Sequence, residues 1–464
     1  MLCLFILLAF QQFNSSFFSQ SSLDSIHVRN IYDYMLENSS CYDNLRSLCK
    51  GVGHRLSGTK SAQDAINWAK FKLDNYGFDS VYLQEITVPH WDRGEIERLD
   101  WTDSNGQLHI TKCTALGGSI GTDGTLSGKV VEINSWNQLK QLGRDGIEGK
   151  LVFFNRPMNP TYISTFMAYG SCVDQRHGGA SKAAEYGAIG VIVRSMSLKM
   201  DHNPHTGSMG YKDGIPKIPA IAISTNDAHD LSEAIKNNEF ELARMKLSCK
   251  QLEDKISYNV IAEIKGNETP ENIILVGGHL DSWDIGEGAH DDGAGVVQSI
   301  EVLKSFIDME VKPKHTLRCV LYMNEENGNR GGKSYAEKVK RDGETHIFAL
   351  ESDRGGFSPR GYSIDGNSNQ LKQIQSFQNL LSPYQLHIFE KGYGGVDIGP
   401  LKDGSVCLVG LVPDSQRYFD FHHAPTDVFE NVNKRELELG AAAITSMVYL
   451  VDKYGFSVPI YNKK

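Results

Sequence analysis

Short apolar runs alternate with amphipathic segments in the second half of the chain. The runs cover residues 273–277, 316–323, 347–350 and 407–412. Between the first two, apolar side chains recur at helical spacing at Val296, Val297, Ile300, Leu303 and Ile307. Short buried strands that alternate with helices are typical of a mostly parallel sheet with helices on both faces. We therefore predict a doubly wound α/β fold here, closed by a helix over residues 436–454.

The middle of the chain has a different pattern of apolar residues. Its apolar runs are shorter and more closely spaced, at residues 129–133, 150–154, 188–194 and 218–223. A single helical segment, residues 177–186, separates two of them, and the region has no dense cluster of His, Asp and Glu. We predict a strand-rich unit over residues 105–245, inserted between two parts of the larger domain, 20–104 and 246–464. Whether a propeptide is removed at the start of the first part stays open.

The first ten residues, MLCLFILLAF, form one continuous apolar run. A bilayer span needs about 20 residues, whereas the core of a signal peptide has this shorter length. We predict a signal peptide over residues 1–19, with a buried first strand as the alternative, and no membrane span after its removal. Asn38 and Asn267 begin glycosylation triplets. These features predict a secreted glycoprotein or one held in the secretory pathway, in the endoplasmic reticulum, the Golgi or the lysosome.

Charge and cysteine content limit the classes of protein to which this chain could belong. The formal net charge is -10, and an acidic chain gains nothing from phosphate contacts, so nucleic-acid binding is excluded as a starting hypothesis. Of eight cysteines one, Cys3, lies in the predicted signal peptide, which leaves an odd number. Cys41 and Cys49 would lie roughly 12 Å apart along a single helix, too far to bridge, so we predict no disulfide between them.

Acidic and histidine side chains follow the end of each predicted strand in the second half. Ligands of doubly wound sheets bind beyond the carboxyl ends of the strands, so we expect these side chains to meet. Each cluster alone has a plainer explanation, such as a helix N-cap or a surface turn. Together they would repel one another without a cation, and mixed nitrogen and oxygen ligands suit zinc, and also manganese or cobalt. The residues are His279, Asp281, Asp291, Asp292, Glu325, Glu326, Glu351, Asp353, His422 and His423.

These motifs resemble a known family. The stretches GGHLDSWDIGEGAHDDGAG, NEEN, ESD and FHHAPTD look like those of the co-catalytic two-zinc peptidases, which include aminopeptidases and glutamate carboxypeptidases. The segments GHRLSG, PHW, PHTG and DGIPKIPA extend the resemblance over nearly the whole chain. The middle unit, with GKLVFFNRP and KAAEYGAIGVIV, is similar to the protease-associated domain that members of the family often carry. The resemblance implies a zinc exopeptidase fold and a homodimer.

The resemblance also implies a ligand set for two zinc ions per chain. His279 and Asp353 would bind one zinc, Glu326 and His423 would bind the other, and Asp291 would bridge the two.

Three further residues receive roles by the same resemblance. Glu325 would be the general base, and Asp281 would lie behind His279 and orient its imidazole. His422 stands where many members have Tyr, and we predict that it donates a hydrogen bond to the oxyanion. The alternative is a histidine without a role. A fourth segment, residues 394–397, lies where family carboxypeptidases have a polar loop near the substrate.

The function expected from these residues is a secreted zinc exopeptidase that hydrolyses unblocked dipeptides and short peptides, as a carboxypeptidase or dipeptidase. A broad-specificity zinc aminopeptidase is the first alternative, because the two classes share the zinc centre. A non-catalytic, receptor-like protein of the same fold is a more distant one, and retention of all five ligands and the base speaks against it. A binding module built round the insert would need no metal.

Overall fold

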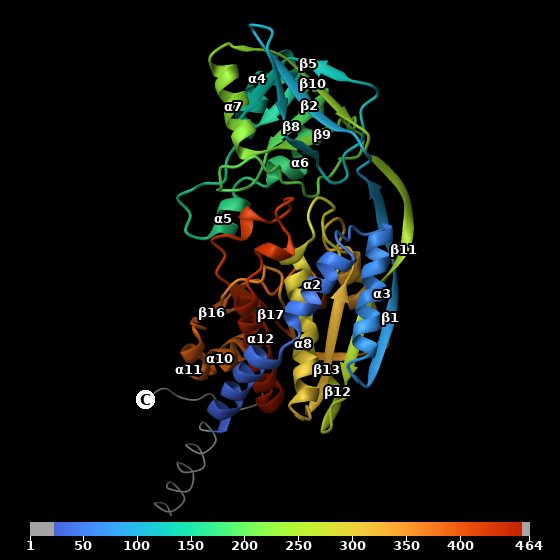
Figure 1. Cartoon of the computed structure of the whole chain (residues 1–464), viewed down its shortest axis with the longest axis vertical. Coiled ribbons are helices and arrows are strands. Elements are labelled where there is room, and N and C mark those ends of the chain that lie inside the picture. Colours follow the sequence, from blue (N-terminus) through green and yellow to red (C-terminus); the bar gives the residue numbers. More distant parts are fainter. Residues whose placement is uncertain (1–22, 457–464) are drawn as a thin grey trace, which may run out of the picture.

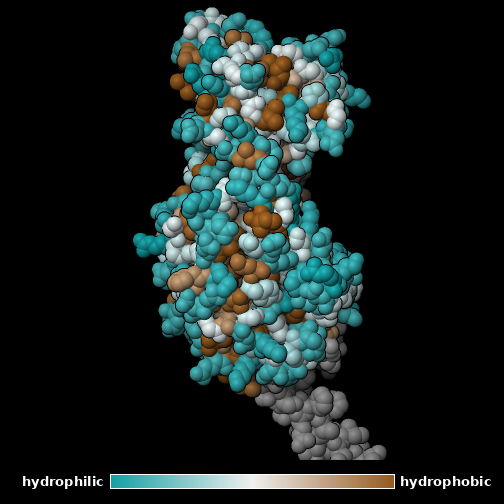
Figure 2. Space-filling model, turned by 90° about the vertical axis from the view of Figure 1, so that its right-hand side faces the viewer, coloured by the Kyte–Doolittle hydropathy of each residue, from teal (hydrophilic) through white to brown (hydrophobic). Residues whose placement is uncertain are grey.

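The computed structural model describes residues 23–456, so the predicted signal peptide lies outside the described range. Two lobes lie one above the other, and two long strands on one side connect them (Figure 1). In the part of the chain that is described, no helix is both long and apolar enough to cross a bilayer. One face of the molecule is mainly hydrophilic, with scattered hydrophobic residues (Figure 2).

The larger lobe is built on one mixed sheet of eight strands. Its order is β1 (Ser80–Asp92), β11 (Lys250–Ile264), β13 (His315–Tyr322), β12 (Thr269–His279), β14 (Thr345–Glu351), β17 (Cys407–Pro413), β15 (Pro359–Asp365) and β16 (Ile388–Lys391). The central strands β13, β12, β14 and β17 are parallel, and all four correspond to predicted apolar runs. Their carboxyl ends therefore lie at one edge of the sheet.

The prediction of a mostly parallel sheet is wrong at the margins of this sheet. β1 pairs antiparallel with β11, β11 pairs antiparallel with β13, and β15 pairs antiparallel with β17. The first of these pairings has a simple cause, because β1 and β11 are the two strands that carry the chain into and out of the upper lobe. Because one of these strands runs towards the upper lobe and the other runs back, the two-stranded ribbon that they form is antiparallel.

Helices cover both faces of the sheet, unequally. One face packs against α2 (Cys41–Gly51), α3 (Lys60–Asp74), α8 (Ala294–Asp308), α10 (Ser368–Ser376), α11 (Gln378–Leu381) and α12 (Lys434–Tyr454), and this is the main core (Figure 1). Residues 23–38 form a further helix that packs there. The opposite face packs against α9 (Arg330–Asp342), which contributes Tyr335 to a smaller core. None of the seven cysteines between residues 23 and 456 is in a disulfide.

The upper lobe, which we call the insert, contains two smaller sheets. A five-stranded sheet has the order β4 (Cys113–Ala115), β9 (Ala220–Ile223), β8 (Gly190–Arg194), β7 (Leu151–Phe154) and β6 (Val130–Ile133). Its last four strands are parallel. An antiparallel sheet has the order β3 (Leu108–Thr111), β2 (Glu97–Asp103), β10 (Phe240–Leu247) and β5 (Leu126–Gly128). The helices are α4 (Trp136–Ile147), α5 (Thr165–Gly170), α6 (Asp174–Ala184) and α7 (Thr225–Lys236).

The insert begins earlier than residue 105. Its first strand, β2, starts at Glu97, and the last register pair of the connecting ribbon joins Asp92 to Lys250. The apolar pattern alone did not locate this boundary.

Candidate metal centre

The carboxyl ends of the parallel strands present the predicted ligands to one another. His279 is the last residue of β12, Glu326 lies four residues after β13, and Asp353 lies two residues after β14. Asp291 lies in a short helical turn, η1 (Ala289–Gly293), directly before α8. His423 follows the turn η4 (Tyr418–Asp420) and has a left-handed backbone, with φ of 58°. The structure therefore brings all five predicted ligands together.

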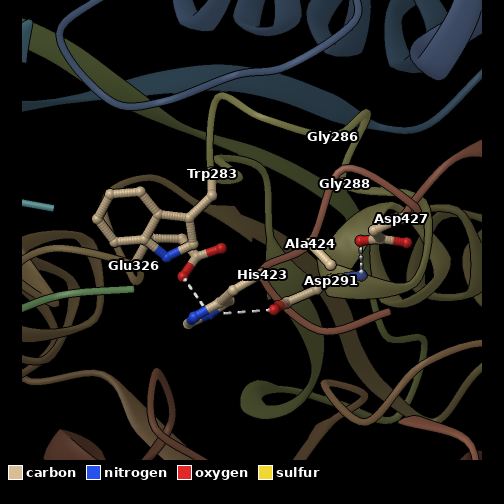
Figure 3. Close-up of a pocket in the computed structure, with 8 residues that line it drawn as sticks. All are labelled: Trp283, Gly286, Gly288, Asp291, Glu326, His423, Ala424 and Asp427. Atoms are coloured by element: carbon tan, nitrogen blue, oxygen red, sulfur yellow. Dashed lines mark hydrogen bonds and ion pairs between the residues drawn. The ribbon is translucent and has the colours of Figure 1, made fainter. Parts of the chain in front are cut away.

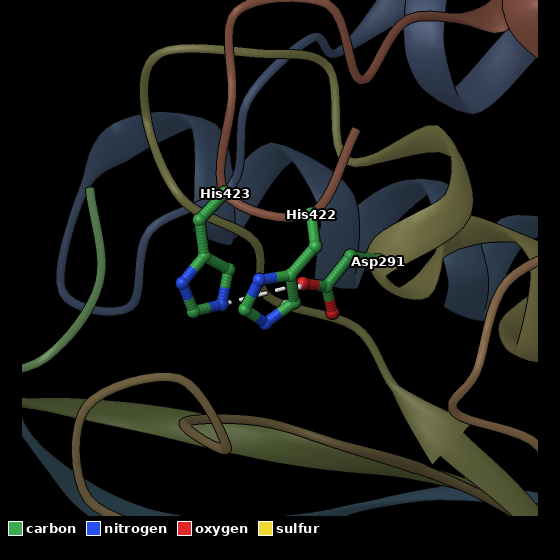
Figure 4. A group of neighbouring side chains, drawn as sticks. All are labelled: Asp291, His422 and His423. Carbon is green, nitrogen blue, oxygen red and sulfur yellow. Dashed lines mark ion pairs between the residues drawn. The ribbon is translucent and has the colours of Figure 1, made fainter. Parts of the chain in front are cut away.

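Asp291 lies between two imidazoles. Its Oδ1 is 3.2 Å from Nε2 of His279, and its Oδ2 is 3.3 Å from Nε2 of His423. Around this axis, Asp353 Oδ1 is 3.5 Å from His279 Nε2, and Glu326 Oε2 is 3.0 Å from His423 Nε2. Figure 4 shows Asp291 facing the two consecutive histidines. The arrangement divides into two halves that share one carboxylate.

The donor set fits metal ions. Three groups of side chains have ligand atoms within 4.8 Å of one another, and Asp291 belongs to two of them, once with His279 and Glu326 and once with His422 and His423. Asp291 Oδ2, Glu326 Oε1 and Asp353 Oδ1 are buried without a hydrogen-bond partner in residues 23–456, and such oxygens are costly unless a partner satisfies them. A cavity of about 10 Å³ is bounded by Asp291, Glu326 and His423 (Figure 3), room for one small ion or water.

The His279 ring has one defined orientation. Its Nδ1–H donates to the backbone carbonyl of Asp281 at 3.0 Å, which leaves Nε2 facing the two carboxylates. The Asp281 carboxylate was expected to make this contact, but it lies 3.8 Å from Nδ1, beyond hydrogen-bonding distance. Residue 281 thus orients the imidazole through its main chain.

The Asp281 carboxylate instead holds the neighbouring strand end. Oδ1 accepts backbone N–H groups of Asn324 at 2.7 Å and Glu325 at 3.1 Å, and Oδ2 accepts that of Glu326 at 3.3 Å. Because three consecutive amides point at one carboxylate, the Glu325 and Glu326 side chains are fixed in direction. The Glu325 carboxylate itself makes no hydrogen bond within residues 23–456 and is free for a substrate.

Burial dominates the electrostatics of the cluster. It raises the pKa of Glu325 and of Glu326 well above the usual range, and the neighbouring carboxylates raise both further. Burial disfavours the charged form of His279, but Asp353 and Asp291 outweigh it, so the pKa of His279 lies well above its usual value. A cation bound here would displace protons from these groups.

His422 lies beside the cluster. Its ring stacks on that of His423 at 3.5 Å, and its Nε2 is 3.8 Å from Asp291 Oδ2 (Figure 4). Burial lowers the pKa of His422 to about 3. A neutral imidazole keeps one N–H donor, so the ring is able to donate a hydrogen bond.

The insert supports the histidine loop. His205 Nδ1–H donates to the carbonyl of His422 at 2.8 Å, and the Thr206 amide donates to the carbonyl of His423 at 2.9 Å. Arg176 Nη1 lies 3.5 Å from His423 Nδ1. The glycine at position 207 leaves room for the His423 ring, because a Cβ there would lie 2.6 Å from His423 Nδ1. These residues come from the PHTG segment and from α6.

Sequence reasoning missed several residues that hold the ligand loops. Buried Arg55, from GHRLSG, donates to the carbonyls of Leu280 at 2.7 Å and Gly288 at 2.9 Å. Asp427, from FHHAPTD, accepts the amides of His290 at 2.7 Å and Asp291 at 3.1 Å. Both residues lie in motifs that carry the family resemblance, and membership of these motifs was the signal that could have identified them.

Comparison with known proteins identifies the family. A family profile described as peptidase family M28 matches residues 259–448. Carboxypeptidase Q from Bos taurus is 33% identical over 91% of this chain and 88% of its own length, and that from Homo sapiens is 32% identical over the same shares. The chain belongs to peptidase family M28. As a member of M28 it is a zinc metallopeptidase, a hydrolase.

Solved structures agree with this assignment to M28. A peptidase M28 precursor from Shewanella amazonensis superposes with a TM-score of 0.89 at 32% identity, over 96% of this chain and 100% of that chain. A zinc aminopeptidase from Bacillus subtilis has the same fold, with a TM-score of 0.63 at 18% identity, over 90% and 96% of the two chains. The first likeness extends over both lobes. The similarity of the insert to a protease-associated domain stays a prediction.

Proposed function

We propose that this M28 peptidase holds two zinc ions per chain and hydrolyses unblocked dipeptides and short peptides, as a carboxypeptidase or dipeptidase. The observation that carries the proposal is the placement of Asp291 between the imidazoles of His279 and His423, with one oxygen toward each. A single carboxylate shared in this way suits a pair of ions better than one. His279 and Asp353 would hold one zinc, Glu326 and His423 the other, and Asp291 both.

The protein's own side chains move the protons. When bound, zinc supplies a Lewis acid toward the scissile carbonyl. The Glu325 carboxylate takes a proton from the attacking water and passes it to the leaving amine. Asp281 keeps the Glu325 backbone in place for both transfers, and the neutral His422 ring donates a hydrogen bond to the developing oxyanion.

The direction of cleavage rests on the likeness to carboxypeptidase Q, which spans 91% of this chain. Most acidic residues near the centre are committed to metal or to backbone amides, with the base Glu325 and the buried Asp397 as exceptions, and this favours recognition of a substrate carboxylate over recognition of an amine. The alternative is an aminopeptidase with the same zinc centre.

Metal analysis and a blocked-substrate panel test the proposal together. We expect two zinc ions per purified chain, and faster hydrolysis of N-blocked than of C-amidated dipeptides. A content of one zinc would contradict the shared-carboxylate arrangement. Rapid cleavage of C-amidated dipeptides, with N-blocked ones inert, would indicate an aminopeptidase and leave the zinc assignment intact.

We further propose that the chain enters the secretory pathway and forms a homodimer. The apolar run at residues 1–10 supports the first proposal, and Asn38 and Asn267 are both exposed, as glycan acceptors must be. An endoglycosidase-sensitive change in mass after expression in eukaryotic cells tests entry. Light scattering of the purified protein tests the dimer, and a monomeric mass would contradict it.

A further inference from the structure

A second cavity lies against the metal-ligand group, on the side of Asp353. It has a volume of about 200 Å³, several times the share of one liquid water molecule of roughly 30 Å³. Arg354 and Asp353 line it from the end of β14, Tyr393 lines it from the loop after β16, and Phe166 lines it from α5 of the insert. The cavity is therefore large enough for a side chain and lies between the insert and the large sheet.

Arg354 is the cation of this cavity. Within residues 23–456 its guanidinium makes no hydrogen bond and no ion pair, and its one close partner is the Phe166 ring, whose centroid lies 5.4 Å away. The Arg354 side chain is partly buried. A guanidinium that has lost part of its hydration gains from a carboxylate partner, which it binds through two parallel hydrogen bonds.

The two carboxylates that line the same cavity are committed elsewhere. Glu351 accepts the backbone amides of Val396 at 2.8 Å and of Asp397 and Ile398 at 2.9 Å each. Asp353 faces His279 in the metal-ligand group. Neither is within ion-pair distance of Arg354, so the structure leaves this cation available to a ligand.

We propose that Arg354 binds a carboxylate of the peptide substrate in this cavity, an inference that rests on the proposed peptidase function. Arg354 follows Asp353 directly, and both residues line the same cavity, so the bound group belongs to a residue close to the scissile bond. Two carboxylates have the required chemistry, the terminal α-carboxylate of the substrate and the side chain of an acidic residue.

The test uses the zinc-loaded full chain, Arg354→Ala and two substrate comparisons. One compares Gln-Leu with its C-terminal amide, and the other compares Glu-Leu with Gln-Leu and Leu-Glu with Leu-Gln. A charge-assisted hydrogen bond contributes enough for a tenfold change in affinity. We expect wild type to prefer the carboxylate-bearing member in one comparison, and Arg354→Ala to reduce that preference about tenfold or more, mainly through KM.

The comparison that changes identifies the carboxylate. Loss of preference only between free and amidated peptides assigns the terminal group, and loss only between Glu and Gln assigns the side chain. Calorimetric titration of the same peptides into Glu325→Gln and Glu325→Gln/Arg354→Ala chains measures binding without turnover. Arg354→Lys keeps the charge but loses the pair of parallel hydrogen bonds that a guanidinium makes. Its preference for the carboxylate should lie between those of wild type and Arg354→Ala.

Arg435→Ala is the matched control, because Arg435 is an exposed arginine of the large lobe outside the cavity. It should leave both preferences within about twofold of wild type. Equal preferences in wild type and Arg354→Ala, or no preference for a carboxylate in wild type, would overturn the inference. Failure of the proposed function differs, since wild type would then hydrolyse none of these dipeptides in a zinc-dependent manner. Because Arg354 has no hydrogen-bonded partner to orphan, we expect its variants to fold, and thermal melting checks this.

Discussion

The two halves of the metal centre are supported in different ways. His279 and Asp353 lie at the ends of the adjacent parallel strands β12 and β14, and the carbonyl that orients the His279 ring belongs to the large lobe. His423 lies on a loop with left-handed backbone, and residues of the insert hold that loop through its carbonyls. One half is built into the sheet, and the other depends on a segment more than 200 residues earlier in the chain.

This difference shows that two metal ligands of the same chemistry, such as His279 and His423, are held in place by different parts of the structure. A strand end fixes a side chain mainly through the sheet itself. A loop must be held by partners, and here Thr206 and His205 are those partners. The insert is thus part of the scaffold of the metal site, and damage to it should affect the His423 half first.

Chelation tests both halves at once and should have the largest effect. Removal of zinc should abolish peptide hydrolysis and lower the melting temperature, because a ligand that binds only the folded state stabilises it. Added zinc should restore both. Full activity of protein shown by metal analysis to be zinc-free would contradict the proposed role of the metal.

Replacement of the base separates proton transfer from metal binding. Glu325→Gln should lower kcat by about 10²–10⁴-fold while both zinc ions stay bound, because the carboxylate acts only in proton transfer. The neighbouring Glu326→Gln should instead lose zinc from the His423 half. Near wild-type turnover by Glu325→Gln would show that the two roles are misassigned.

A substitution in the insert sharpens the comparison. Gly207→Ala places a Cβ against the Arg176 guanidinium and 2.6 Å from His423 Nδ1, so it displaces the ring directly and through Arg176. Since displacement of a catalytic group by about 1 Å costs up to about 100-fold, we expect a loss of 10–100-fold in kcat/KM and release of one zinc.

Gly214→Ala is the control for that substitution. Gly214 also lies in the insert with positive φ, but its added Cβ would meet no atom within 4 Å. Its φ is 78°, against 132° at Gly207, so the variant also carries strain from a positive φ, and it should keep both zinc ions. Equal zinc loss in the two variants would contradict the specific role of Gly207.

The smallest expected effect concerns one hydrogen bond between the lobes. His205→Leu leaves the His422 carbonyl without its donor, which should lower the free energy of unfolding by about 1–3 kcal/mol. His205→Asn is able to restore a donor near the Nδ1 position and should recover part of the loss. Denaturant unfolding measures both, and identical stabilities would show that the bond contributes nothing.

The strand-end half was predictable from sequence for a physical reason. A buried parallel strand needs a short apolar run, and a site beyond its carboxyl end needs polar side chains directly after that run. Both signals are local, as at His279 and Asp353. The candidate ligands could therefore be grouped from the sequence pattern, although their individual roles rested on the family resemblance.

The remainder depends on contacts that no local pattern encodes. The main-chain role of Asp281 follows from the path of the loop after β12, and the position of His205 under His422 follows from the packing of two lobes. The antiparallel margins of the sheet follow from the ribbon that carries the insert. Each requires knowledge of which distant segments meet.

The same ribbon makes the insert a detachable module. Since Asp92 pairs with Lys250, both ends of the insert lie one strand spacing apart, and a two-residue turn is long enough to join them. Gain or loss of the upper lobe by recombination would leave the eight-stranded sheet and the ligands at its strand ends undisturbed. The added lobe then bears on chemistry at the histidine loop and at the cavity that Phe166 lines, which gives evolution a way to alter these two places without redesigning the sheet.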